Sequence, residues 1–357
     1  MANDGKGDSG GGTATWIIAA ALTVSAGYFL FDEKPDRAPN NLPLVQEGLP
    51  QVGLEGEGTA RVQPALPESR PDPEPAISVL PTPNPTPAPE PVRKEVVMGS
   101  AVPPTGFGKR WTPSGTTIEL LWVPPGEFKM GSPPAEQHRR SWEKLHGVTL
   151  TEGFWLGKYE VSQRDWVGLG MRNKSYVNGP LNPVSRVSWN EAMSFCLRLD
   201  SHVREKMDLP DGYAFRLPTE AEWEYACRAG TSTASAFGDS MDSRQANFDG
   251  RFPLGDGKKD INRKRPMPVG YYPPNPWGFH EMHGNVWEWC LDSWRELPTV
   301  NEVDPAALHP HAYKVAKGGS WYVHGWECRS TCRHGLKQDV RYRTGVGLRV
   351  CLGRVME

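Results

Sequence analysis

The chain has 357 residues and a formal net charge of −2 at pH 7, and it contains 38 Gly, 35 Pro and 14 Trp. The balanced charge excludes the basic surplus that is typical of nucleic-acid-binding proteins, so we expect no nucleic-acid partner. Many glycines and prolines predict short elements joined by turns, and the tryptophans predict a core built from large rings. Although this length allows two domains, we expect one folded domain.

The N-terminal segment predicts a membrane anchor. Residues 1–13 are rich in Gly, Asp and Ser and are expected to be disordered. Residues 14–31 form an uncharged apolar run, and as a helix of about 27 Å they match the hydrocarbon thickness of a bilayer. A cleaved signal peptide with a Val-Ser-Ala site at 24–26 is the alternative. We favour an uncleaved transmembrane helix or signal anchor, because the apolar run continues to Phe31 and no basic segment precedes it.

Residues 32–105 predict a disordered, Pro-rich tether. They lack a periodic apolar pattern, and most positions in residues 81–91 alternate with proline, which is typical of a polyproline II spacer. We expect the tether to hold a folded domain, residues 106–357, away from the membrane surface. That domain is expected to be extracytoplasmic, in the periplasm or at the cell surface.

The folded domain is expected to begin with short strands and a short helix. Apolar and aromatic residues between turn signals predict strands in three segments. These segments are 118–123, 126–132 and, as a strand pair, 147–158. Ser162 and Asp165 have the spacing that caps the start of a helix, which we expect to run through Trp166.

Two further capping boxes, in which Ser or Thr precedes Glu by three residues, predict the main helices. The first box is Ser188 to Glu191 and the second is Thr219 to Glu222. Apolar residues follow the first box at helical spacing: Ala192, Phe195, Cys196, Leu199 and Val203. Gly230 is expected to end the second helix. Because strands and helices do not alternate, we expect an α+β fold that is rich in loops, with few helices and short antiparallel strands.

The stretch Gly284–Trp289 places Glu288 between two tryptophans. A carboxylate buried among indole rings requires a charged or hydrogen-bonding partner. A metal ion is one such partner. The alternative is a Trp-rich core in which Glu288 pairs with an arginine such as Arg349.

Seven segments, in order, resemble the motifs of the formylglycine-generating enzyme (sulfatase-modifying factor) family. They are GEFKMGS at 126–132, KYEVS at 158–162, PVSRVSW at 183–189, RLPTEAEWEYA at 216–226, GNVWEW at 284–289, GGSW at 318–321 and GLRV at 347–350. The resemblance covers residues 106–353. It implies a compact fold that is poor in regular structure and related to C-type lectin-like domains.

The resemblance implies an activity that the residues support only in part. Enzymes of this family oxidise a sulfatase cysteine to formylglycine, with copper held by two cysteines spaced C-x4-C after the Gly-Gly-Ser motif. The first position here is Val323 and the second is Cys328, whereas the local pair Cys328 and Cys332 is spaced C-x3-C. Valine offers no soft ligand for Cu(I). Copper is therefore doubtful, and we expect a module that binds a protein, peptide or glycan; a formylglycine-generating oxidase with a catalytic Cys328–Cys332 pair is the alternative.

The resemblance also implies structural calcium. In the family, calcium is held by a side-chain oxygen before the Gly-Asn-x-Trp-Glu motif, by backbone carbonyls and by the motif glutamate. The matching positions are Glu281, Gly284, Val286 and Glu288, and a possible second calcium site begins at Asn247 and Phe248. Hard oxygen ligands of this kind suit calcium.

The histidines and cysteines do not form a further recognisable site. A branch similar to iron-dependent sulfoxide synthases takes its histidines partly from an extra N-terminal helical domain, but this chain has the Pro-rich tether there. His280 and His283 are therefore expected to be ordinary surface or core histidines. Of the six cysteines, some can pair if the domain is extracytoplasmic, whereas Cys196 and Cys227 are expected to be free buried thiols.

Overall fold

The structure of the protein is a computed structural model that describes residues 106, 108–207, 209–342 and 345–356. The predicted N-terminal segment (1–13), anchor (14–31) and tether (32–105) lie outside the described residues. In the part of the chain that the structure describes, no helix has both the length and the apolar character needed to cross a bilayer.

The largest sheet has five strands, and every neighbouring pair in it is antiparallel. In spatial order the strands are β1 (Arg110–Trp111), β2 (Leu120–Val123), β5 (Phe154–Gly157), β12 (Cys351–Arg354) and β6 (Tyr213–Arg216). The last strand of the chain thus pairs between β5 and β6, which joins the C-terminal motif to the first half of the domain.

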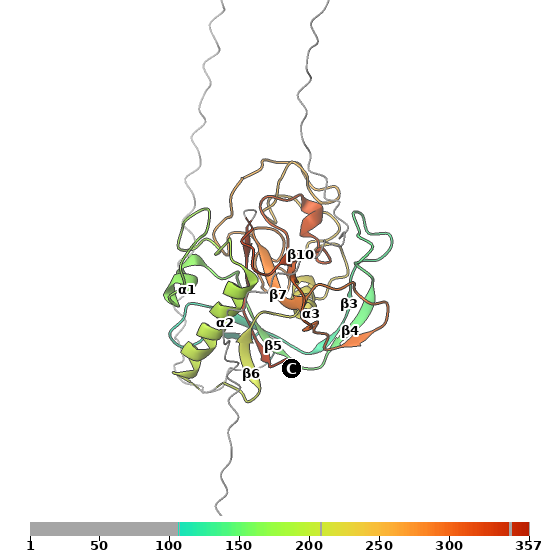
Figure 1. Cartoon of the computed structure of the whole chain (residues 1–357). Coiled ribbons are helices and arrows are strands. Elements are labelled where there is room, and N and C mark those ends of the chain that lie inside the picture. The colour runs from blue at the N-terminus through green and yellow to red at the C-terminus, as the bar shows by residue number, and fades with distance from the viewer. Residues whose placement is uncertain (1–105, 107, 208, 343–344, 357) are drawn as a thin grey trace, which may run out of the picture. The chain divides into compact units, whose positions relative to one another are not determined.

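Two smaller sheets complete the strand structure (Figure 1). One has the order β10 (Arg333–Lys337), β9 (Tyr313–Lys317), β7 (Trp287–Ser293) and β11 (Val346–Gly347), and the other has β3 (Gly126–Met130), β4 (His146–Leu150) and β8 (Glu302–Val303). Only the two-residue strands β11 and β8 pair in parallel among the described strands. The expected α+β fold with short, mainly antiparallel strands is therefore confirmed.

The helices begin where the capping boxes predict. They are α1 (Gln163–Gly168), α2 (Trp189–Arg204) and α3 (Glu220–Arg228). The caps are Ser162, Ser188 and Thr219, and in each box both reciprocal hydrogen bonds are present. The sequence analysis predicted no helix at the one-turn 3-10 helix η1 (Gly325–Cys328).

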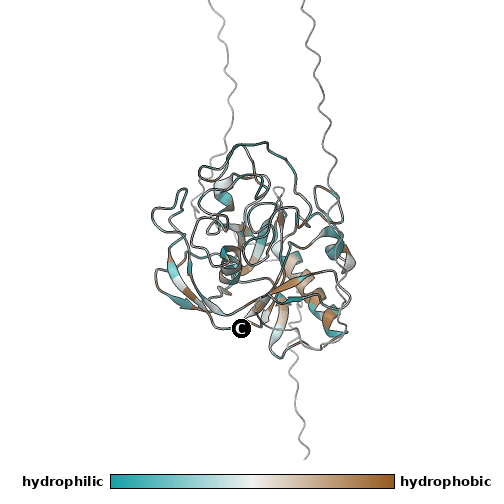
Figure 2. Cartoon of the chain, turned by 180° about the vertical axis from the view of Figure 1, so that it is seen from behind, coloured by the Kyte–Doolittle hydropathy of each residue, from teal (hydrophilic) through white to brown (hydrophobic). Residues whose placement is uncertain are grey.

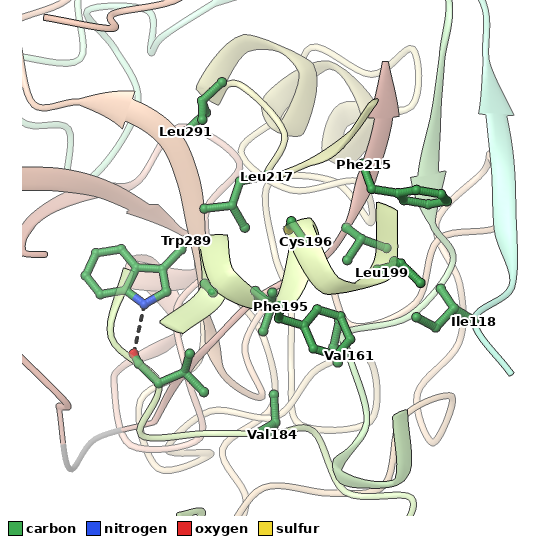
Figure 3. Close-up of a cluster of buried hydrophobic side chains, with 14 of the residues drawn as sticks. Ile118, Val161, Val184, Phe195, Cys196, Leu199, Phe215, Leu217, Trp289 and Leu291 are labelled. Atoms are coloured by element: carbon green, nitrogen blue, oxygen red, sulfur yellow. Dashed lines mark hydrogen bonds between the residues drawn. The ribbon is translucent and has the colours of Figure 1, made fainter. Parts of the chain in front are cut away.

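The core is formed by side chains from all parts of the domain. The long helix α2 buries Phe195, Cys196 and Leu199 in the main hydrophobic cluster and carries both hydrophobic and hydrophilic residues, as expected of a helix with one buried face (Figure 2). Trp289 of β7 packs in the same cluster, and its indole Nε1 donates to the carbonyl of Val187 at 2.9 Å (Figure 3).

All six cysteines are buried and free. The prediction of free buried thiols at Cys196 and Cys227 is confirmed, and the structure contains no disulfide between any of the six cysteines.

Candidate functional site

Glu288 of β7 is fully buried, and its partner in the structure is an arginine. Arg349 donates from Nη2 to Oε1 of Glu288 at 2.7 Å and from Nε to Oε2 at 3.0 Å. The indole Nε1 of Trp223 on α3 donates to Oε2 at 2.7 Å. This is the arginine-paired arrangement that the sequence left open as the alternative to a metal.

Two more buried carboxylates share the surroundings of Arg349. Glu160 accepts from the side chain of Asn285 at 2.6 Å and from the backbone of Val286 at 3.0 Å. Glu281 accepts from the backbone of Gly270 at 2.9 Å and of Tyr272 at 3.1 Å. We call Glu160, Glu281, Glu288 and Arg349 the carboxylate cluster.

The cluster contains more negative than positive charge. Burial, followed by the carboxylates of Glu281 and Glu288, raises the pKa of Glu160 well above its usual range. Burial also raises the pKa of Glu281 to about 7. A single arginine therefore does not neutralise three buried carboxylates, and the cluster favours either a bound proton or an additional cation.

One residue from each of the two predicted calcium sites lies beside the other. Asn247 forms a β-bridge with Gly284, and its carbonyl accepts from the backbone of Asn285 at 2.8 Å. Gly284 has a φ of 81°, and a Cβ there would lie 2.2 Å from the carbonyl oxygen of Asn247. Only glycine permits this close approach. Phe248, by contrast, packs its side chain in a hydrophobic cluster.

The charge around Glu281 and Gly284 would suit an oxygen-liganded cation, although both carboxylates of the predicted site already accept hydrogen bonds. The carboxylate cluster has surplus negative charge, and the buried Oδ1 of Asn247 has no hydrogen-bond partner among the described residues. Across those residues, no group of three or more His, Cys, Asp or Glu side chains is arranged to hold a metal. A calcium ion here would thus need carbonyl oxygens, such as those of Gly284 and Val286, together with Glu281 and Glu288.

The loop that carries the predicted copper position is tightly packed. Gly318 and Gly319 have φ values of 92° and 80°, and a Cβ on Gly319 would lie 2.4 Å from Sγ of Cys328. Val323 is partly buried and packs against two hydrophobic clusters. Cys328 belongs to one of these clusters and Cys332 to the other.

The C-x4-C pair that would hold copper is incomplete, because Val323 stands at its first position. Burial holds the pKa of the Cys328 thiol well above its usual range and raises that of Cys332 to about 12. Burial thus disfavours the thiolate form in the metal-free protein, whereas a bound metal ion deprotonates the thiols that coordinate it. The side chain of Val323 provides no ligand.

His283 is a satisfied core residue, as the sequence predicts. Its Nε2 accepts from the backbone of Ala236 at 3.0 Å, so Nδ1 carries the proton and donates to the carbonyl of Cys328 at 2.7 Å. Burial lowers its pKa to about 4. His280, which is partly buried, lies 2.9 Å from the carbonyl of Tyr272 through Nδ1.

The structure also contains a pocket that sequence reasoning missed, which we call the basic aromatic pocket. Its volume is about 550 Å³. Four polar residues line it, namely Arg186, Arg251, Asn262 and Lys264. The remaining lining residues are aromatic: Tyr176, Trp321 and Tyr322.

The basic aromatic pocket is connected to the central motif. The backbone of Trp321 donates to the carbonyl of Asn285 at 2.9 Å, so the loop after Gly319 is held against the stretch 284–289. Arg186 and Trp321 each belong to a motif that the sequence analysis singled out, at 183–189 and 318–321. These two motifs were the only sequence signal that pointed to the pocket. The other lining residues come from loops that no sequence pattern brings together.

Comparisons with known proteins agree with this architecture. Residues 111–353 match the family model described as a sulfatase-modifying factor enzyme 1-like domain. The mouse formylglycine-generating enzyme is 30% identical over 190 residues, which cover 52% of this chain and 46% of that protein. The mouse protein named inactive C-alpha-formylglycine-generating enzyme 2 is 32% identical over 157 residues, or 43% of this chain and 41% of that protein. The chain thus spans less than half the length of these two relatives.

The solved structure of PvdO from Pseudomonas aeruginosa has a similar fold. It aligns with a TM-score of 0.58 and 25% sequence identity over 70% of this chain and 99% of that chain.

Proposed function

This chain belongs to the family of sulfatase-modifying factor enzyme 1-like domains, and from that premise we propose that it is a binding member of the family without copper oxidase activity. The ligand is a protein, peptide or glycan. In this proposal residues 14–31 anchor the chain in a membrane, and the folded domain lies outside the cytoplasm.

The observation that carries the proposal is the valine at the first of the two copper-cysteine positions. Val323 stands at the first cysteine position, and Cys328 and Cys332 are both buried. Two thiolates are the soft ligands that Cu(I) requires. One relative is itself named inactive, so membership of the family does not by itself imply oxidase activity.

A pocket with exposed rings and cations supports binding as the remaining function. Tyr176 and Tyr322 are 65% and 59% exposed at the basic aromatic pocket. Tyrosine side chains that are partly exposed to solvent offer an apolar ring for contact and a hydroxyl for hydrogen bonding. Such side chains are typical of binding sites.

Copper binding provides the direct test. Titration of the protein lacking residues 1–31 with Cu(I) should show no stoichiometric, high-affinity binding, because Val323 removes one of the two sulfur ligands. The Cys328→Ala variant is the matched control and should give the same titration curve as the parent. Tight binding of one Cu(I) that is lost in Cys328→Ala would overturn the proposal and favour the formylglycine-generating oxidase.

Membrane association tests the proposed anchor. The full-length protein should remain in the membrane fraction after washing with high salt or carbonate, because about 27 Å of apolar helix is buried in the bilayer. A variant lacking residues 1–31 should be soluble and folded, since the described fold begins at residue 106. Release of the full-length protein by either wash would contradict the anchor.

A further inference from the structure

We propose that the basic aromatic pocket binds an acidic saccharide, that is, a sugar ring that carries a carboxylate or sulfate group. This inference rests on the proposed binding function and names the class of ligand. It is carried by cations that form no ion pair with the described residues and by exposed rings beside them.

Arg186 and Lys264 are the two unpaired cations of the pocket. Neither side chain forms an ion pair with any described residue, and the Nε of Arg186 is buried without a hydrogen-bond partner in the described part of the chain. A buried donor that lacks an acceptor is unfavourable. An anionic ligand would satisfy it, and a guanidinium binds two oxygens of a carboxylate or sulfate group with matching geometry.

The backbone holds both cations in an uncommon conformation. Arg186 has a φ of 58° and Lys264 a φ of 55°, and side chains other than glycine rarely adopt this left-handed region. Such conformations are concentrated at ligand-binding sites, where the surrounding structure enforces them. Here they place two positive charges at one pocket.

The third cation does not add to the unbalanced charge. Arg251 donates from Nε and Nη2 to the two carboxylate oxygens of Asp249, at 2.9 and 2.6 Å. Among the described residues, no aspartate or glutamate lines the pocket. Two positive charges, those of Arg186 and Lys264, therefore remain for a ligand.

The aromatic residues favour a ring over an extended chain. Trp321 and Tyr322 lie perpendicular to each other, with ring centroids 5.4 Å apart and an interplanar angle of 80°, so they form a corner. Tyr176 adds a further exposed ring. The apolar C–H face of a sugar can pack on such rings while its acidic group reaches the cations.

The same surroundings disfavour an acidic peptide. None of the described lining residues belongs to a β-strand, and only Asn262 among them forms an isolated β-bridge, with Asp249. In the described part of the chain, the pocket therefore offers a peptide backbone no strand edge for pairing. Peptides in extended conformation gain much of their affinity from such pairing.

Calorimetric titration with four probes tests this inference. The probes are a hyaluronan tetrasaccharide with carboxylates, a heparin tetrasaccharide with sulfates, neutral maltotetraose and a tetraglutamate peptide. We expect at least one acidic tetrasaccharide to bind, with affinity that falls as salt rises, and we expect neither maltotetraose nor the peptide to bind. The two acidic probes distinguish the carboxylate from the sulfate form of the ligand.

Glycine substitutions remove the cations without disturbing the fold. Because Arg186 and Lys264 have positive φ, Arg186→Gly and Lys264→Gly should melt no lower than the parent protein. Each should weaken binding of the acidic tetrasaccharide by about tenfold or more. Lys129→Gln is the matched control, since Lys129 is an exposed cation on β3 outside the pocket, and its affinity should stay within about twofold of the parent.

Three results would overturn the inference. These are binding of maltotetraose as tight as that of the acidic probes, binding of the peptide alone, and the absence of binding by every probe. Peptide binding that is lost in Arg186→Gly would leave the proposed binding function standing. The copper titration is independent of this pocket, so failure of the proposed function is measured separately.

Discussion

Replacing Arg349 by methionine should destabilise the domain by about 3–5 kcal/mol, which is the range for breaking a buried ion pair by removing one partner. Arg349 is the cation of the carboxylate cluster, and its loss leaves Glu288 charged and buried beside Glu160 and Glu281. Arg349 also donates to the carbonyls of Gly157 and His280, both at 2.8 Å. Urea unfolding of Arg349→Met against the parent measures the effect.

Two further variants make this result specific. The double variant Glu288→Gln/Arg349→Met removes the unpaired charge together with its partner, so it should recover part of the lost stability. Arg354→Met is the matched control, because its ion pair with Glu152 is 3.4 Å long and both side chains are 52% exposed. An exposed pair of this kind is worth at most about 1 kcal/mol. If Arg349→Met were as stable as Arg354→Met, the carboxylate cluster would not be a source of stability.

Removal of calcium should lower the melting temperature of the domain by about 5 °C or more. A ligand present at 100 times its dissociation constant stabilises the native state by about 2.7 kcal/mol, and for a domain of this size each kcal/mol shifts the melting temperature by about 2–4 °C. The physical reason is the surplus negative charge of Glu160, Glu281 and Glu288 around one arginine. Thermal unfolding with chelator and after addition of calcium measures the shift.

The variant Glu288→Gln is the control for calcium. It keeps the shape of the side chain but loses the charge, so it should melt lower in calcium and lose most of its response to chelator. Magnesium should restore the parent less than calcium, because it demands near-octahedral geometry at shorter distances. A parent protein with the same melting temperature with and without chelator would contradict the calcium site and leave the pairing of Glu288 with Arg349 as the full account of its burial.

Elements whose signals are local could be predicted from the sequence. The capping boxes at Ser162, Ser188 and Thr219 lie within three residues of the groups they bond, so the starts of α1, α2 and α3 were predicted correctly. The spacing of apolar residues along α2 likewise predicted which face of the helix is buried, because this pattern lies within one segment of the chain. The helix η1 was missed because its single turn has no side-chain cap.

The sequence by itself also determined the family, because seven motifs occur in the family's order. It also revealed that Val323 replaces a copper-position cysteine. Both conclusions follow from the order of residues and need no knowledge of contacts between distant segments. Only the tertiary structure decided which partner Glu288 takes, because Arg349 lies 61 residues further along the chain. It likewise decided that Cys328 and Cys332 are buried and not disulfide-bonded. The basic aromatic pocket, too, could be found only in the tertiary structure. Its cations and rings come from loops spread between residues 176 and 322. Contacts between such loops depend on the packing of the whole domain and not on any local sequence pattern.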